Sequence, residues 1–308
     1  MEDVKSIRPG WYNAFRPWSL HGAVVPVVIG GVVAYVDGYM NWWIFLMVLL
    51  CGCLLQSAAN LLNTYGDYVK GTDTLDTVGN RSRSPELVTG TLKPKSVLLA
   101  GLACLGITAL CGIVFVWYIG WGIMAFGILG IAGAGLYTVG ISYKYYAMGL
   151  ISVFFMMGIL MPLGTYYVMS GEISNEVLFM SLPNAFIITA VLSGNETRDY
   201  HEDKQAGVMT LSGFLSYKGS LRLYIALNCI AFPILLALIA LQMIPWACGL
   251  AFLALADMYI LVRNWKEAPS DERKGRLLVP LSFRMNWHFG LLLVVGYLIG
   301  QYLITGTI

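Results

Sequence analysis

Hydrophobic residues occur along this chain in nine runs that are each long enough to cross a bilayer. A membrane-spanning helix needs about 20 predominantly apolar residues. Such runs begin near positions 20, 42, 97, 121, 148, 178, 222, 245 and 286. No composition shift or low-complexity tract divides them. The pattern therefore predicts an all-α, polytopic membrane protein with nine transmembrane helices in a single domain over residues 1–308.

The composition supports a chain whose solvent is largely lipid. Hydrophobic residues make up 58% of it, charged residues 12%, and the mean hydropathy is +0.71. This leaves too little polar surface to cover a water-soluble globule of 308 residues. The net charge of +2 and the lack of a long basic run exclude nucleic-acid binding. The six cysteines lie inside apolar runs without the spacing of a zinc site or a disulfide framework.

The basic residues predict the orientation of the chain in the membrane. All 19 Lys and Arg residues lie in five regions: Lys5 to Arg16, Lys70 to Lys95, Lys144, Arg198 to Arg222, and Arg263 to Arg284. These regions are the N-terminal segment and alternate connections or the helix ends beside them. By the positive-inside rule they face the cytoplasm. We therefore expect a cytoplasmic N-terminus, a C-terminus on the opposite side, and a site on the cytoplasmic face of the cytoplasmic membrane. The N-terminal stretch has no cleavage pattern of a signal peptide.

The first acidic segment follows the second apolar run, from Asn60 to Asp73. On a helix, offsets of three and seven residues place Asn60, Asn63 and Asp67 on one face. Gly71 then allows the chain to turn, so that Asp73 folds back toward this face. The spacing predicts a cluster of oxygen ligands at the end of a transmembrane helix.

The second acidic segment follows the sixth apolar run and repeats this arrangement. Offsets of four and eight residues place Asn195, Asp199 and Asp203 in one stripe. Carboxylates four residues apart on a helix repel one another by a few tenths of a kcal/mol. The repulsion is relieved when a cation lies between them, so the stripe favours a metal site.

Oxygen ligands of this kind suit Mg²⁺, which takes one or two carboxylates together with substrate phosphate oxygens. We predict two Mg²⁺ ions held by Asn63, Asp67, Asp73, Asn195, Asp199 and Asp203, with Asn63, Asp67, Asp199 and Asp203 essential for catalysis. Basic side chains add contacts to a substrate diphosphate. The candidates for these contacts are Arg81, Arg83, Lys144, Arg198 and Lys204.

Other interpretations of the acidic segments remain open at this stage. Either segment alone is also compatible with an ordinary solvated helix end. A cation or lipid transporter would use acidic clusters too, but its sites usually lie near the bilayer midplane rather than at one membrane face. The three histidines are dispersed, which argues against zinc or a histidine nucleophile.

The residues resemble the UbiA superfamily of intramembrane prenyltransferases, and within it the 1,4-dihydroxy-2-naphthoate prenyltransferases of menaquinone synthesis. The resemblance rests on five stretches: Phe15 to Leu20, Asn60 to Asp73, Tyr137 to Gly140, Pro162 to Tyr167, and Asn195 to Leu211. It implies an all-α bundle with a central cavity, in which Asn63, Asp67, Asp73, Asp199 and Asp203 match the metal-diphosphate motifs. It also implies transfer of a prenyl group from a polyprenyl diphosphate to an aromatic acceptor such as a dihydroxynaphthoate or another phenol. A membrane terpene cyclase of the same superfamily is the alternative.

Two positions depart from the pattern of the resembled family. Thr64 stands where the family often has a further Asp, and Leu150 stands where an acid often follows a Gly-Leu-Gly element. An apolar side chain cannot accept a hydrogen bond or act as a base. From Leu150 we expect a cavity with a less polar acceptor region and weak activity toward 1,4-dihydroxy-2-naphthoate.

Overall fold

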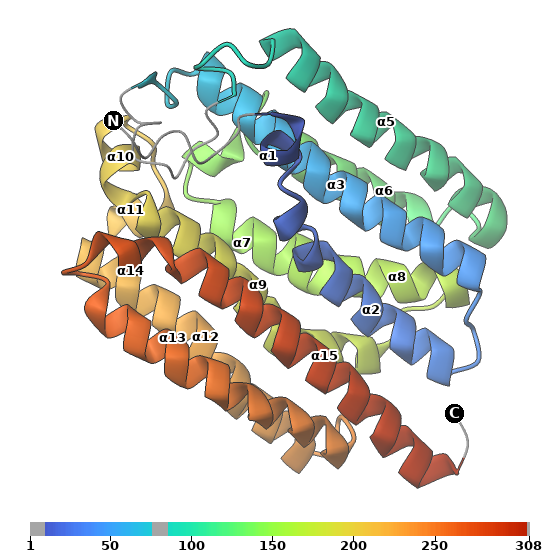
Figure 1. The fold of residues 1–308 in the computed structure, drawn as a ribbon. Helices are drawn as coiled ribbons and strands as arrows, with labels where there is room; N and C mark the ends of the chain where they lie inside the picture. Colours follow the sequence, from blue (N-terminus) through green and yellow to red (C-terminus); the bar gives the residue numbers. More distant parts are fainter. Residues whose placement is uncertain (1–9, 76–85, 307–308) are drawn as a thin grey trace.

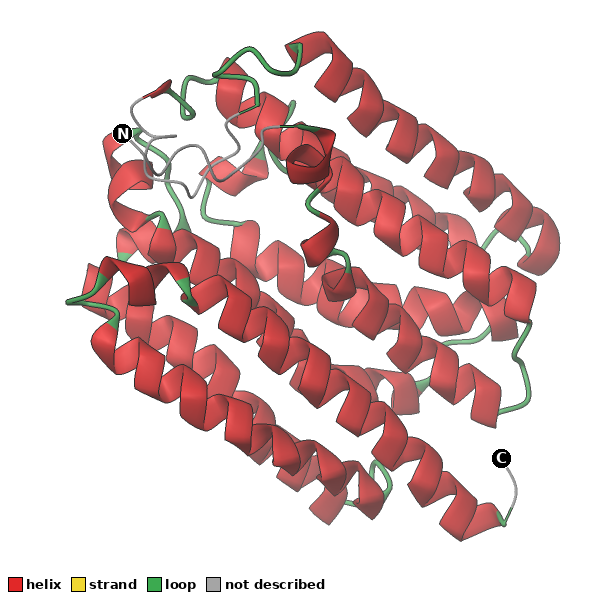
Figure 2. Ribbon diagram, viewed as in Figure 1, coloured by secondary structure: helices red, strands yellow, loops and turns green. Residues whose placement is uncertain are grey.

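The computed structural model describes residues 10–75 and 86–306, and this part of the chain is helical without β-strands (Figures 1 and 2). The long helices run along a common direction and form a bundle. Their bounds are α2 His21–Val36, α3 Trp42–Val69, α5 Pro94–Ile119, α6 Ile123–Gly135, α9 Asn175–Arg198, α12 Tyr217–Ala240, α13 Leu255–Glu267 and α15 Leu278–Thr305. Short elements connect or extend them: α1 Trp11–Phe15, η2 Pro17–Ser19, η3 Tyr143–Tyr145, α7 Gly149–Val153, η4 Phe154–Leu160, α8 Met161–Ser170, α10 Tyr200–Gln205, α11 Leu211–Phe214, η5 Trp246–Ala254 and α14 Glu272–Arg276.

Each of the nine predicted spans coincides with a helical segment. In the described part of the chain, seven segments are long and apolar enough to cross a membrane: α3, α5, α7–η4–α8, α9, α12, η5–α13 and α14–α15. An eighth is obtained if α1–η2 and α2, which meet at a bend of 40°, form one span. The remaining segment, α6, has 13 residues and is shorter than a span requires. The chain is thus a multi-pass membrane protein, and the count of nine spans stays a prediction.

Helix α9 is the central helix of the bundle. In the apolar 18-residue stretch of α9, 72% of the residues are buried, compared with 22% in the corresponding stretch of the peripheral α5. It packs against α12 and α15 on one side and η4 on the other. Gly158 makes the η4 contact possible, because a Cβ at this position would lie 2.4 Å from the Cβ of Ala185. Small residues of this kind let membrane helices approach closely. The contact holds α9 against η4, and both segments line the cavity described below.

The two acidic segments lie at the same end of the bundle, although more than 120 residues separate them. The end of α3 and the α9–α10 region are both on the left of the view in Figure 1, whereas α15 ends at the opposite side. A backbone hydrogen bond also joins the connection after α6 to the connection after α10, since the amide of Ala147 donates to the carbonyl of Met209 at 2.8 Å. The prediction that both segments contribute to one site is therefore consistent with the fold.

The orientation predicted from the basic residues is testable by cysteine labelling. Ser270 and Glu172 are exposed and lie in connections that the charge pattern assigns to opposite sides of the membrane. In a background without the six native cysteines, we expect Glu172→Cys to react with a membrane-impermeant maleimide in sealed right-side-out cells. Ser270→Cys should react only after the membrane is opened. The reverse pattern would show that the orientation is wrong.

Candidate active site

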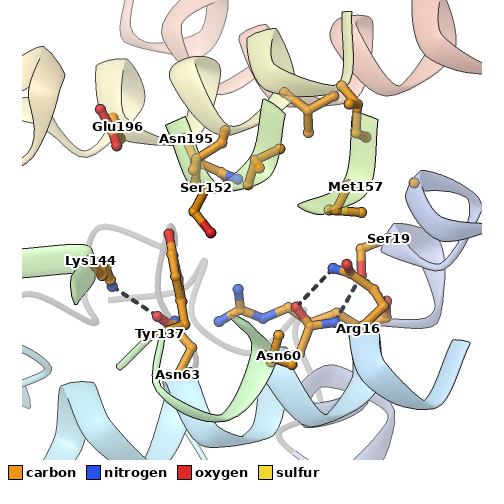
Figure 3. Close-up of a pocket in the computed structure, with 18 of the residues that line it drawn as sticks. Arg16, Ser19, Asn60, Asn63, Tyr137, Lys144, Ser152, Met157, Asn195 and Glu196 are labelled. Atoms are coloured by element: carbon orange, nitrogen blue, oxygen red, sulfur yellow. Dashed lines mark hydrogen bonds between the residues drawn. The ribbon is translucent and has the colours of Figure 1, made fainter. Parts of the chain in front are cut away.

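A cavity of about 550 Å³ lies between α2, α3, α6, α9 and α15 and the η3–η4 segment (Figure 3). One part of its wall is polar and includes the two acidic segments: Asn63, Asp67, Asp73, Lys144, Asn195, Arg198, Asp199 and Asp203. The rest of the wall is mainly apolar: Leu55, Val153, Met156, Met157, Met161, Ile188, Val191, Val279 and Phe283. An elongated ligand with an anionic head and an apolar chain matches this division of the wall.

The end of α3 forms the first half of the polar wall. Asp67 and Asp73 are both buried, with 6% and 7% of their surface exposed. Gly71 has φ of +71°, a left-handed conformation that glycine adopts without strain. After this turn the amide of Asp73 donates to the carbonyl of Asp67 at 3.2 Å. The predicted fold-back of Asp73 is confirmed.

The side chains of Asn63 and Asp67 converge on one cationic group, the ammonium of Lys144. Its Nζ lies 2.9 Å from Asn63 Oδ1 and 2.8 Å and 3.0 Å from the two carboxylate oxygens of Asp67. Thr138 also donates to Asn63 Oδ1, at 3.0 Å, and Tyr145 donates to Asp67. Burial and the adjacent carboxylate of Asp67 raise the pKa of Tyr145, so this phenol remains a donor. The amide and carboxylate oxygens therefore already form a binding position for a cation.

The second acidic segment crosses a break between two helices. Helix α9 ends at Arg198 and α10 begins at Tyr200, but the i to i+4 backbone bonds continue, from Asp199 to Asn195 at 3.0 Å and from Asp203 to Asp199 at 2.8 Å. The predicted stripe is thus retained across the break. Arg198 forms two 2.7 Å hydrogen bonds with the Asp199 carboxylate. Such a bidentate pair fixes the guanidinium beside the acidic groups.

Not every predicted diphosphate contact is in the cavity wall. Lys204 is exposed, does not line the cavity, and places its ammonium 5.6 Å from the ring centroid of Tyr200. Lys204 directly follows Asp203 in α10, and the helix rotation of about 100° per residue turns its side chain away from the wall that Asp203 lines. The prediction of a diphosphate contact for Lys204 is therefore not supported. Arg81 and Arg83 lie outside the described residues. Arg16, which was not predicted as a site residue, lines the cavity (Figure 3).

Asn60 has a structural position in the site. Its Nδ2 donates to the carbonyl of Phe15 at 3.0 Å and to the hydroxyl of Ser19 at 2.9 Å. These bonds fasten the segment before α2 to α3. Because Arg16 lies between the two acceptors in the sequence, Asn60 fixes the segment from which Arg16 enters the cavity.

The charges in the described cavity wall favour a bound cation. Five acidic side chains (Asp67, Asp73, Glu196, Asp199, Asp203) and three basic ones (Arg16, Lys144, Arg198) line it, so acidic groups outnumber basic groups in this wall. Within residues 10–75 and 86–306, no group of three or more His, Cys, Asp or Glu residues could hold a metal by itself. Mg²⁺ requires only one or two carboxylates when phosphate oxygens complete its shell. The two acidic segments line one cavity and each supply two aspartate carboxylates, so they fit this requirement.

The polar residues of the wall that were not predicted as site residues include Tyr137, Ser152 and Glu196. Ser152 donates to the hydroxyl of Tyr143 at 2.9 Å. Glu196 directly follows Asn195, and its place in the second acidic segment was the available signal. Tyr137 belongs to a stretch on which the family resemblance rests, but it has no acidic or basic neighbour that would single it out.

Comparison with known proteins identifies the family. The model of the UbiA prenyltransferase family matches residues 23–290. The chain belongs to the UbiA prenyltransferase family. Among curated relatives, it is 28% identical to a 1,4-dihydroxy-2-naphthoate octaprenyltransferase of Bacillus subtilis (strain 168) over 93% of this chain and 91% of that protein. It is also 28% identical to the human UbiA prenyltransferase domain-containing protein 1, over 93% and 82% of the two chains. The protein is therefore a prenyltransferase.

Solved UbiA structures share the fold. An apo UbiA homolog from Aeropyrum pernix K1 has a TM-score of 0.65 at 16% identity and covers 91% of this chain and 98% of that one. A UbiA homolog from Archaeoglobus fulgidus bound to GPP and Mg²⁺ has a TM-score of 0.61 at 14% identity, covering 92% and 98%. At these identities the likeness concerns the arrangement of the helices.

A single glycine positions the first half of the site. A Cβ on Gly66 of α3 would lie 2.5 Å from Thr138 Cγ2 and 3.0 Å from the Thr138 carbonyl. Gly66→Ala should therefore push away the segment that carries Thr138 and Lys144, and we expect prenyl transfer to fall about 10-fold or more, as a displacement of about 1 Å in a site often does. Gly106→Ala on α5, where nothing lies within 4 Å, is the matched control. Equal activities of the two variants would contradict this role.

Proposed function

We propose that this protein transfers a polyprenyl group from a polyprenyl diphosphate to an aromatic acceptor, with Mg²⁺ as cofactor. The observation that carries the proposal is the shared cavity. Asn63, Asp67 and Asp73 enter it from α3, and Asn195, Asp199 and Asp203 enter it from α9–α10. Its apolar remainder offers a place for an isoprenoid chain. The A. fulgidus homolog of the same fold was solved with GPP and Mg²⁺, which supports this class of ligand.

In the proposed reaction the allylic carbon–oxygen bond breaks and its electron pair leaves with the diphosphate. A π electron pair of the ring forms the new carbon–carbon bond, and the ring then loses a proton and becomes aromatic again. When bound, Mg²⁺ supplies charge neutralisation for the departing diphosphate. Lys144 and Arg198 provide charged hydrogen-bond donors beside the carboxylates. The surrounding helices exclude water from the allylic cation that forms when the carbon–oxygen bond breaks. The carboxylate and amide oxygens of the two segments hold the ions.

We further propose that the acceptor is a hydroxylated naphthalene, such as a dihydroxynaphthoate, and that the product enters menaquinone or related quinone synthesis. The name and the long alignment of the B. subtilis relative support this class. Our expectation of weak naphthoate activity rested on Leu150 lining the acceptor region. Leu150 is 3% exposed and is not part of the cavity wall, so this premise is wrong. The charge pattern supports a site on the cytoplasmic face of the cytoplasmic membrane.

The proposal is tested with purified protein, Mg²⁺ and labelled geranylgeranyl diphosphate. The acceptors are 1,4-dihydroxy-2-naphthoate, hydroxybenzoate, homogentisate and a neutral naphthoquinol, with products detected by mass. We expect prenylated rings, with the highest kcat/KM for a naphthalene acceptor. Diphosphate release with cyclised prenyl products and no prenylated acceptor would instead identify a terpene cyclase.

A further inference from the structure

Glu196 is a buried carboxylate that lies between Ser212 and the cavity. It lies on α9 in the cavity wall and has 6% of its surface exposed. Its Oε2 accepts a hydrogen bond from the backbone amide of Ser212 at 3.1 Å. The side chain of Ser212 also interacts with this carboxylate. The other oxygen of Glu196, Oε1, is open to a donor from a molecule in the cavity.

Gly149 leaves space beside this oxygen. A Cβ built on Gly149, the first residue of α7, would lie 3.3 Å from Glu196 Oε1 and 3.5 Å from the hydroxyl of Tyr137. The carboxylate oxygen and the phenol thus approach the same bare stretch of backbone from two different elements. Any larger residue at this position would occupy the gap between them.

Tyr137 supplies the complementary group. It lines the cavity near Ser152 and Asn63 (Figure 3). Its hydroxyl makes no hydrogen bond within the described part of the chain. With an ordinary pKa of about 10, a phenol is protonated at neutral pH and serves as a donor. A hydrogen-bond acceptor and a hydrogen-bond donor therefore face one position, and a hydroxyl group is the ligand that satisfies both.

This position lies close to the expected reaction centre. Glu196 precedes Asp199 by three residues, a rise of about 5 Å along a helix. A ring held by its hydroxyl at Glu196 would therefore lie beside the diphosphate end of the prenyl substrate rather than beside its apolar chain. A ring carbon next to the hydroxyl is then near the allylic carbon.

We propose that Glu196 and Tyr137 form the subsite for a ring hydroxyl of the aromatic acceptor. The hydroxyl donates to Glu196 Oε1 and accepts from the Tyr137 phenol. The inference rests on the proposed function and specifies its acceptor as a phenol or hydroquinone with a free hydroxyl, in preference to an aryl ether. In this arrangement the acid that recognises the ring comes from α9, and the Leu150 position is not needed for it.

The test uses Glu196→Gln, which keeps the volume of the side chain but presents a hydrogen-bond donor to the ligand in place of an acceptor. Because the Ser212 amide needs an acceptor, the glutamine oxygen turns to it and the NH₂ group faces the cavity. We compare kcat/KM for 1,4-dihydroxynaphthalene and 1,4-dimethoxynaphthalene with geranylgeranyl diphosphate as donor. Wild type should prefer the hydroquinone. In Glu196→Gln this preference should fall at least about 10-fold, as expected when a buried hydrogen-bond pairing is mismatched, and the change should lie mainly in KM for the hydroquinone.

Two further variants make the result decisive. Glu176→Gln lies on the same helix and outside the cavity wall, and it should retain the wild-type preference. Tyr137→Phe removes the donor alone and should lower the preference in the same direction, which provides an answer even if Glu196→Gln does not fold. An unchanged preference in the folded variants, or an equal loss for both acceptors, would overturn the subsite.

The proposed function is checked separately in wild type. Mg²⁺-dependent release of diphosphate from geranylgeranyl diphosphate tests the metal-diphosphate half of the site without any acceptor. If this release occurs and the hydroxyl preference is the same in all variants, the subsite is wrong and the proposed function stands. If wild type releases no diphosphate and forms no prenylated ring, the proposed function itself fails.

Discussion

Replacing Asp67 or Asp199 with asparagine is expected to lower the consumption of polyprenyl diphosphate by about 10²- to 10³-fold, the usual effect of removing one electrostatic element from a site. The two carboxylates lie in different halves of one cavity wall. Each asparagine keeps the size of the side chain but removes a charge that, in the proposed mechanism, would hold a cation against the leaving group. Initial rates of diphosphate release measure the effect, and chelation with EDTA should abolish release in wild type.

The control for these variants is Asp37→Asn. Asp37 follows α2 at the opposite end of the bundle, where its carboxylate accepts a hydrogen bond from Tyr166 at 2.7 Å. An asparagine oxygen can accept the same bond, so we expect wild-type rates. Full turnover in EDTA, or wild-type rates in both site variants, would be incompatible with a metal-diphosphate mechanism.

The acidic half of the site could be predicted from the sequence because its geometry is local. Helical periodicity alone places Asn63 and Asp67 on one face, and a glycine at position 71 is enough to predict the turn that returns Asp73. Long apolar runs likewise predict helices in lipid without reference to their neighbours. The short α6 marks the limit of this reasoning, since its apolar run is long but its helix has only 13 residues.

Contacts between distant segments could not be predicted in this way. Lys144 and Lys204 are both basic residues near a membrane boundary, and only the packing of the η3 segment against α3 brings the first of them to Asp67. Asp257 shows the same limit. Arg263 lies six residues further along the same helix, whereas the structure pairs Asp257 with Arg284 and His288 of α15. The partner of a charge on a helix depends on which helix lies beside it.

Lys144 and Lys204 also provide the second large expected effect. We expect Lys144→Met to lower kcat/KM for the polyprenyl diphosphate by about 10²-fold, and Lys204→Met to change it by less than about fivefold, as is usual for exposed charges. Lys144 is held by Asn63 and Asp67 at the polar end of the cavity, where the diphosphate would bind. Lys204 is exposed outside it. Initial rates at varied diphosphate and Mg²⁺ concentrations measure both effects.

The Mg²⁺ dependence of Lys144→Met separates two roles for this side chain. The Lys144 ammonium occupies the position on Asn63 and Asp67 at which the proposed Mg²⁺ would bind, so it would compete with the metal for the same oxygens. Its removal should lower the Mg²⁺ concentration needed for half-maximal rate, while the loss of a charged contact to the diphosphate lowers the rate at saturating Mg²⁺. A side chain that only stabilised the fold would reduce the amount of active protein without shifting the Mg²⁺ requirement. Loss of rate with an unchanged Mg²⁺ requirement would therefore show that Lys144 does not share its position with the metal.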